Sequence, residues 1–318
     1  MTQYALRRLF LVIPTLFGVT MVVFMAVRFL PGDVVDQLSG EYGAASPEFR
    51  AQLVKQYSLD KNMPQQYALW MGKLARGDMG ISIISARSVR GEISQRLPTT
   101  FLLGLMAIFV QLVIAIPVGM TAALKQDSTI DYVARSLSIG LLAVPGFWMA
   151  LLAITYGYIL FGWTPPLRYH PFWEEPLTAL KSLWVPALIL GGFISAVVMR
   201  LLRSTMLEVL RQDYIRTARA KGLDERAVVW RHAARNAAIP VVTIIGLEIP
   251  NLIGGTVIME SIFSIPGMGS YLFSSIQIRD YPVVQGVVLL SALVVILSNL
   301  VVDLSYSIID PRIRFHGR

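Results

Sequence analysis

The stretch YIRTARAKGLDERAVVWRHAARNAAIPVV, residues Tyr214–Val242, stands out because it is charged and lies between two almost purely apolar runs. Gly222, near its centre, is typical of a helix C-terminus, and Asp224 is a favourable N-cap for a following helix. The stretch therefore predicts two short helices, Arg211–Lys221 and Ala227–Ala238, the second running into the next apolar run.

The composition of the chain is that of a membrane protein. Its 318 residues are 55% hydrophobic and only 15% charged, and the mean hydropathy is +0.60. A soluble domain carries about 25% charged residues. The chain has no cysteine, which excludes disulfides, zinc–thiolate sites and a cysteine nucleophile. The class to consider first is therefore a polytopic membrane protein.

Six apolar runs are long enough to cross a bilayer, for which a helix needs about 20 residues. Prolines inside several of them, such as Pro145, Pro240 and Pro250, predict kinks or broken turns. The fold class predicted is all-α with six transmembrane helices. The runs are Leu9–Leu30, Thr99–Leu124, Val133–Phe161, Trp184–Leu202, Ala237–Met259 and Val283–Tyr306.

The distribution of lysine and arginine predicts that both termini lie inside, because short inner loops carry an excess of these residues. With this orientation the two shorter outer loops hold only Arg168, Lys181 and Arg279. The expected parts are a tail with the first span, an outer segment, a five-span core containing an inner loop, and an inner tail. Their bounds are residues 1–30, 31–98, 99–306 (inner loop 204–236) and 307–318.

Charge alone leaves two interpretations of the inner loop open. The loop could bind anionic lipid headgroups through its basic residues. It could instead contact a protein partner, for which Val228, Val229 and Trp230 would supply an apolar surface.

Ordered motifs along nearly the whole chain resemble the permease subunits of ABC importers, in the branch that carries peptides and nickel. The charged stretch is similar to the EAA-loop signature of that branch, although the general pattern has a glutamate where Arg216 stands here. The motifs are RRLFLVIPTLFGVTMVVFMAVRFLPGD ending at Asp33, RGDMG at 76–80, RLPTTF at 96–101, TARAKG at 217–222, RHAARN at 231–236, ESIFSIPGMG at 260–269, RDYP at 279–282 and DPRIR at 310–314.

The resemblance implies a type I importer permease whose coupling helices, within residues 211–236, dock on an ATP-binding subunit. It also implies a second homologous permease, two ATP-binding subunits, an outer solute-binding protein and a bacterial inner membrane. Peptides are the favoured substrate, and nickel chelates, glutathione and oligosaccharides stay open. The coupling residues implied are Arg216, Thr217, Ala218, Arg219, Ala220, Lys221, Gly222, Leu223, Asp224 and Arg231.

Several sequence features bear on catalysis and cofactors. The chain contains no G-x-x-x-x-G-K-[ST] phosphate loop, so ATP and Mg²⁺ are expected in partner subunits, and no cofactor or nucleic acid is expected on this chain. His170, His232 and His316 are the only histidines and lie in expected loops or the tail, so no metal site is expected.

Four residues of the expected spans are candidates for the translocation path: Gln111, Phe147, Glu248 and Asn251. Charged and polar groups at membrane depth are costly and often functional. Glu248 could meet the substrate or hydrogen-bond to a neighbouring helix, Gln111 favours a helix–helix hydrogen bond, and Phe147 could form a gate or pack in the core. Glu260, at the outer edge of the fifth run, is expected to fix the connector that follows it.

Two other classes of membrane protein fit the sequence less well. A stand-alone secondary transporter would show repeated halves or many intramembrane charges. An intramembrane enzyme would need a nucleophile–base pair or metal ligands at membrane depth. Neither pattern stands out in the sequence, so the importer permease is preferred.

Overall fold

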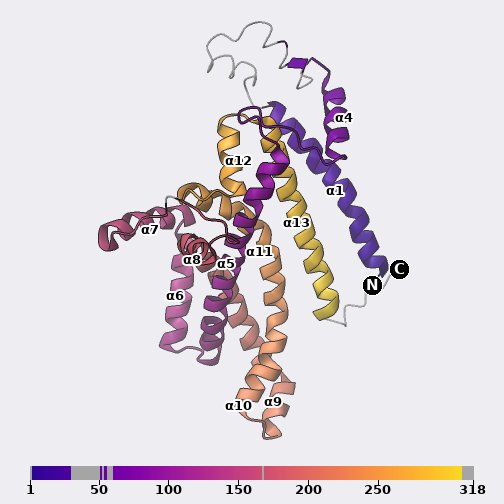
Figure 1. Cartoon of the computed structure of the whole chain (residues 1–318). Coiled ribbons are helices and arrows are strands. Elements are labelled where there is room, and N and C mark those ends of the chain that lie inside the picture. Colours follow the sequence, from indigo (N-terminus) through magenta and orange to yellow (C-terminus); the bar gives the residue numbers. More distant parts are fainter. Residues whose placement is uncertain (1, 30–50, 52–53, 56–59, 167, 310–318) are drawn as a thin grey trace. The chain divides into compact units, whose positions relative to one another are not determined.

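A computed structural model describes the chain apart from residues 1, 30–50, 52–53, 56–59, 167 and 310–318 (Figure 1). The side chains of residues 2–9, 27, 29, 250–251 and 302–309 also lie outside the described part. Within what is described, the regular structure is helical apart from one isolated β-bridge between Ile81 and Ser88. The helices are α1 (Thr2–Phe29), α4 (Met63–Leu74), α5 (Val89–Leu124), α6 (Thr129–Ala143), α7 (Gly146–Phe161), α8 (Pro176–Leu210), α9 (Asp213–Ala220), α10 (Glu225–Ala227), the π-helix η1 (Val228–Ala233), α11 (Ala234–Ile262), α12 (Met268–Gln277) and α13 (Tyr281–Ile309).

Within the described residues all six apolar runs are helical, the third as two separate helices. Among the described residues, α5, α8 and the part of α13 up to Val301 are long and apolar enough to span a membrane. Two bent pairs, α6 with α7 and residues 225–249 with 252–262, raise the number to five if each pair is one span. The apolar part of α1, Phe10–Ala26, is shorter. The all-α membrane class is therefore confirmed, whereas six crossings and their orientation stay predictions.

The third expected span, Val133–Phe161, is not one continuous helix. Helix α6 ends at Ala143, α7 begins at Gly146, and the two axes meet at 96°. Val144 has an extended backbone, with ψ of 126°, because the ring of Pro145 disfavours the helical conformation of the residue before it. The proline thus breaks the run into two helices of 15 and 16 residues.

The chain divides into two compact units, and the larger comprises residues 98–270 with the end of α13 from Leu297. Within it, α8 contacts α6, α7, α11 and η1. Gly191 lets the backbone of α8 approach α5 closely, since a side chain there would overlap with the carbonyl of Ala107 and with Val110. Small residues commonly allow such close helix contacts in membranes.

A buried ion pair ties α6 to α8 in this unit. Asp131 is fully buried, and its carboxylate accepts two hydrogen bonds from Arg203, at 2.5 Å from Nε and 2.6 Å from Nη2. The backbone N–H of Asp127 donates a further hydrogen bond to Asp131 at 3.0 Å. Because a buried charge without a partner is costly, this paired geometry fixes the position of α6 on α8.

The second unit comprises residues 2–97 and 271–296. In it, Tyr67 of α4 hydrogen-bonds to Thr20 of α1 at 2.8 Å, and its ring packs edge-on against Phe24. Asp280, which is buried, accepts hydrogen bonds from the Ser82 hydroxyl at 2.5 Å and the Ile83 N–H at 3.2 Å. The Tyr67 contacts hold α4 against α1, and the Asp280 contacts hold the loop before α5 against the loop before α13.

The connector after α11 is organised around Glu260, as the sequence predicted. The Glu260 carboxylate is fully buried and accepts hydrogen bonds from the Thr100 hydroxyl at 2.6 Å and the Ser270 N–H at 2.9 Å. The same Thr100 hydroxyl accepts a hydrogen bond from the Met268 N–H at 2.8 Å. A side chain at Gly267 would overlap with the carboxyl group of Glu260. The glycine therefore makes room for the carboxylate that fixes the turn.

We expect Gly267→Ala to lower the melting temperature of the purified protein in detergent, because the added methyl group must displace the Glu260 carboxyl. Overpacking of this kind costs about 1–3 kcal/mol. Gly254→Ala is the matched control, since a Cβ at that position of α11 meets no atom within 4 Å and alanine favours a helix more than glycine does. Equal melting temperatures for the two variants would contradict this account of Gly267.

Candidate functional site

The first short helix of the charged segment, which we define as residues 211–236, ends as the sequence predicted. Gly222 follows the end of α9 with φ of +78°, a conformation that favours glycine. The Gly222 N–H donates to the carbonyl of Arg219 at 2.9 Å, and the Leu223 N–H donates to that of Ala218 at 3.4 Å. This pair of hydrogen bonds is a Schellman motif, which satisfies the last carbonyl groups of the helix.

The second short helix begins immediately afterwards, and an ion pair connects it to the first. The side chain of Asp224 caps α10 by accepting a hydrogen bond from the Arg226 N–H at 3.2 Å, as predicted. Arg219 of α9 donates two hydrogen bonds to the carboxylate of Glu225, at 2.7 and 3.1 Å. These hydrogen bonds lower the pKa of the Glu225 carboxyl, so it is ionised at neutral pH. This pair was not predicted from the sequence, although the two residues flank the predicted break.

After α10 the chain forms a π-helix, η1, instead of the continuous α-helix expected from Ala227 to Ala238. The hydrogen bonds of a π-helix join residues five apart. The wider turn brings Val228 and Ala233 to the same side, and both are fully buried. The π-helix thus replaces the expected α-helix because it buries both side chains. The spacing of apolar residues in the sequence does not reveal this packing.

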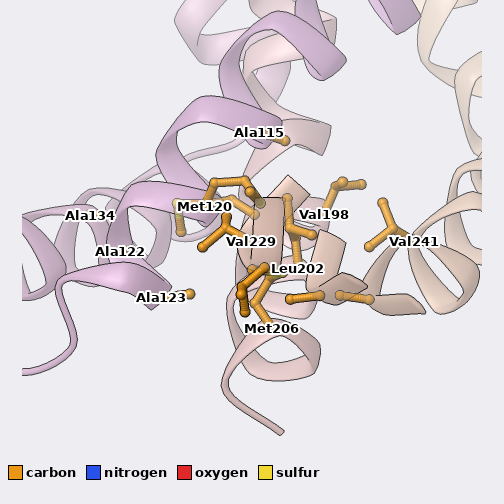
Figure 2. Close-up of a cluster of buried hydrophobic side chains, with 14 of the residues drawn as sticks. Ala115, Met120, Ala122, Ala123, Ala134, Val198, Leu202, Met206, Val229 and Val241 are labelled. Atoms are coloured by element: carbon orange, nitrogen blue, oxygen red, sulfur yellow. The ribbon is translucent and has the colours of Figure 1, made fainter. Parts of the chain in front are cut away.

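The charged segment is seated on a hydrophobic cluster at the end of α8 (Figure 2). The cluster buries Ile215 and Ala218 of α9 together with Val228 and Val229 of η1. Outside the cluster, Asn236 donates a hydrogen bond to the Tyr214 hydroxyl at 2.8 Å, which joins α9 to α11. Other members of the cluster are Ala115, Met120, Ala122, Ala123, Ala134, Val198, Met199, Leu202, Met206, Ala233, Ala237 and Val241.

The packing of the charged segment on this cluster corrects one expectation from the sequence. Val228 and Val229 do not form an external apolar surface, because η1 turns them into the chain's own core. Trp230 does face outward, with 63% of its surface exposed, and Leu223 is 44% exposed. The outward apolar surface is therefore made mainly by Trp230 and Leu223, together with the ring of Tyr214.

Most of the expected coupling residues lie on the surface of the charged segment. Figure 1 shows α9 and α10 at one end of the long helices α8 and α11, which they join. Ala218 is the exception, since it is buried in the hydrophobic cluster. The exposed face is mainly basic, and it is suited to an acidic partner surface. The exposed residues of the expected set are Arg216, Thr217, Arg219, Ala220, Lys221, Gly222, Leu223, Asp224 and Arg231.

The candidates for the translocation path lie in three different helices. Gln111 of α5 is fully buried, and neither atom of its amide has a hydrogen-bond partner among the described residues. Phe147, in the first turn of α7, is 50% exposed, and Glu248 of α11 is half-buried. The side chain of Asn251 lies outside the described part. A shared path for these four residues stays a prediction, and no three acidic or histidine side chains of the described residues form a metal-binding group.

Over residues 115–315 the sequence matches the family described as the binding-protein-dependent transport system inner membrane component. The chain belongs to this family. As a member of the binding-protein-dependent permeases, it is a transport component of the inner membrane and is not itself catalytic. Transporters of this ABC type use ATP in a separate ATPase and work with a binding protein.

Similarity to individual members of the family extends over the full length. The chain is 42% identical to the dipeptide transport system permease protein DppB of Escherichia coli (strain K12), over 99% of both chains. It is 41% identical to the di/tripeptide transport system permease protein DppB of Pseudomonas aeruginosa (strain UCBPP-PA14), again over 99% of both. A putative peptide transport system permease protein of Brucella abortus (strain 2308) is 39% identical, over 99% of this chain and all of the relative.

Proposed function

We propose that this chain is one permease half of an ATP-driven peptide importer and that its charged segment is the docking surface for an ATP-binding subunit. The proposal is supported by the 42% and 41% sequence identity, over 99% of both chains, to a dipeptide and a di/tripeptide permease. The complete transporter would contain a second homologous permease, two ATP-binding subunits that bind ATP and Mg²⁺, and an external solute-binding protein. Both termini and the charged segment would face the cytoplasm.

The geometry of the charged segment supports a docking role. Two short helices project from the ends of α8 and α11, and their outer face combines arginine and lysine side chains with the apolar surfaces of Leu223 and Trp230. Protein interfaces commonly combine an aromatic or apolar anchor with a polar rim. A partner groove lined by carboxylates, with room for an indole ring, would match this face in charge and in shape.

The packing of the charged segment explains how a movement of the partner would be transmitted to the membrane-spanning helices. The buried side chains of α9 and η1 pack against α8, and η1 continues directly into α11. A displacement of the short helices would therefore move the ends of both long helices together. To shift a permease from 1:99 to 99:1 between two states, the nucleotide-driven contacts must favour one state by roughly 5.5 kcal/mol.

Peptides are the proposed substrates because the similar permeases are described by dipeptide, di/tripeptide or peptide transport. Glu248 and Gln111, with Phe147 and Asn251, are the proposed contacts along the path. A half-buried carboxylate such as Glu248 could pair with the amino terminus of a peptide.

Purification of the chain from its native host in mild detergent, followed by mass spectrometry, tests the assembly. We expect a second permease, ATP-binding subunits and a solute-binding protein to co-purify, and peptides to be bound to the solute-binding protein. A bound nickel chelate, glutathione or oligosaccharide would replace the peptide assignment. Recovery of the chain alone, under conditions that preserve other membrane complexes, would contradict the proposed assembly.

Replacing Gly222 tests the docking role of the turn. Gly222→Val should strongly reduce ATP-dependent dipeptide uptake into liposomes, because a β-branched residue is strained at φ of +78°. A Cβ at this position meets no atom within 4 Å, so the expected defect comes from backbone strain and not from a clash of the Cβ. Gly222→Asn is the matched control, since asparagine tolerates this conformation, and it should retain most of the uptake. Normal uptake by the valine variant would show that the turn has no such role.

A further inference from the structure

We propose that the ion pair between Arg219 and Glu225 is a positioning device that fixes the angle between α9 and α10 while the ATP-binding subunit moves them. The inference rests on the docking function proposed above and assigns a role to two residues within it. Arg219 lies in the last turn of α9, and Glu225 is the first residue of α10. The pair therefore spans the turn at Gly222 and joins the two helices directly.

The geometry of the pair suits it to hold an angle. Arg219 donates through Nε and Nη2 to both oxygens of the Glu225 carboxylate, at 3.1 and 2.7 Å. Two parallel hydrogen bonds between a planar guanidinium and a planar carboxylate restrict rotation as well as distance. The connection that they bridge contains Gly222, which has the greatest conformational freedom of any residue. Without the pair, α9 and α10 could change their relative angle at this glycine.

Thermal stability alone does not account for the pair. The side chains of Arg219 and Glu225 are 43% and 60% exposed, and exposed ion pairs contribute little to folding. The hydrophobic cluster already holds α9 and η1 against α8 through buried residues such as Ile215 and Val228. What the cluster leaves exposed is the turn from Lys221 to Arg226, which is the part that the ion pair restrains.

The two charges could instead act separately, each through its own helix end, and an experiment can distinguish this explanation from the ion pair. Each charge also suits its own helix end, since a cation is favourable at the C-terminus of α9 and an anion at the start of α10. The exchanged variant Arg219→Glu/Glu225→Arg restores opposite charges across the turn but places each charge at the unfavourable helix end. If this variant regains function, the ion pair across the turn is what matters. If the charges act only through the helix ends, the exchanged variant should be more defective than either single change.

The experiment uses the whole transporter, reconstituted in liposomes with its binding protein and a radiolabelled dipeptide. The quantity measured is the number of ATP molecules hydrolysed per dipeptide imported. We expect Glu225→Gln to leave the subunits co-purifying and to raise this ratio roughly fivefold, which corresponds to about 1 kcal/mol. The exchanged variant should return the ratio to within about twofold of the parent, the residual defect reflecting the unfavourable helix-end charges. Glu175→Gln, which removes the exposed pair with His170 elsewhere in the chain, is the control and should leave the ratio unchanged.

The outcomes distinguish this inference from the proposed function. The positioning role would be overturned, while the docking function stands, by an unchanged ratio in Glu225→Gln. It would also be overturned by an exchanged variant that still co-purifies with the ATP-binding subunits but has a larger defect than the single change. A parent chain that recovers no ATP-binding subunit, or imports no dipeptide, would instead overturn the proposed function.

Discussion

The hydrophobic cluster at the end of α8 is the contact on which the candidate site depends. It buries apolar side chains of α9 and η1, including Ile215 and Val228, beneath a surface that is otherwise strongly charged. Apolar burial is the main favourable term available to such short helices, which are too short to be stable alone. The charged face is consequently displayed on a rigid base, and its orientation follows that of α8 and α11.

Helix α8 connects this base to the rest of its unit through contacts of different kinds. At one end, the buried ion pair between Asp131 and Arg203 holds α6, and the Thr205 hydroxyl donates to the carbonyl of Ala237 in α11 at 3.1 Å. Further along, Gly191 permits close packing against α5. Polar contacts and close backbone approach supply the specificity that apolar surfaces alone lack in a bilayer.

The sequence predicted the helical class, the helix end at Gly222, the cap at Asp224 and the role of Glu260, because each depends on local chemistry or on a long apolar run. It did not predict the pairing of Asp131 with Arg203, whose partners are 72 residues apart, or the inward turn of Val228 and Val229. Both depend on packing between distant segments. Pro145 signalled a break, but the 96° angle is set by the contacts of α7 with α8 and α11.

The π-helix η1 determines how the charged face that precedes it is rotated relative to the apolar helix α11 that follows it. Residues Val228–Ala233 take up more chain per turn than an α-helix would, so they set the rotational phase between the charged face and the apolar span that follows. Loss of one residue there would rotate the two by about 100°. The number of residues in η1 therefore sets the orientation of the charged face about the axis of α11 without any change in the sequence of either one.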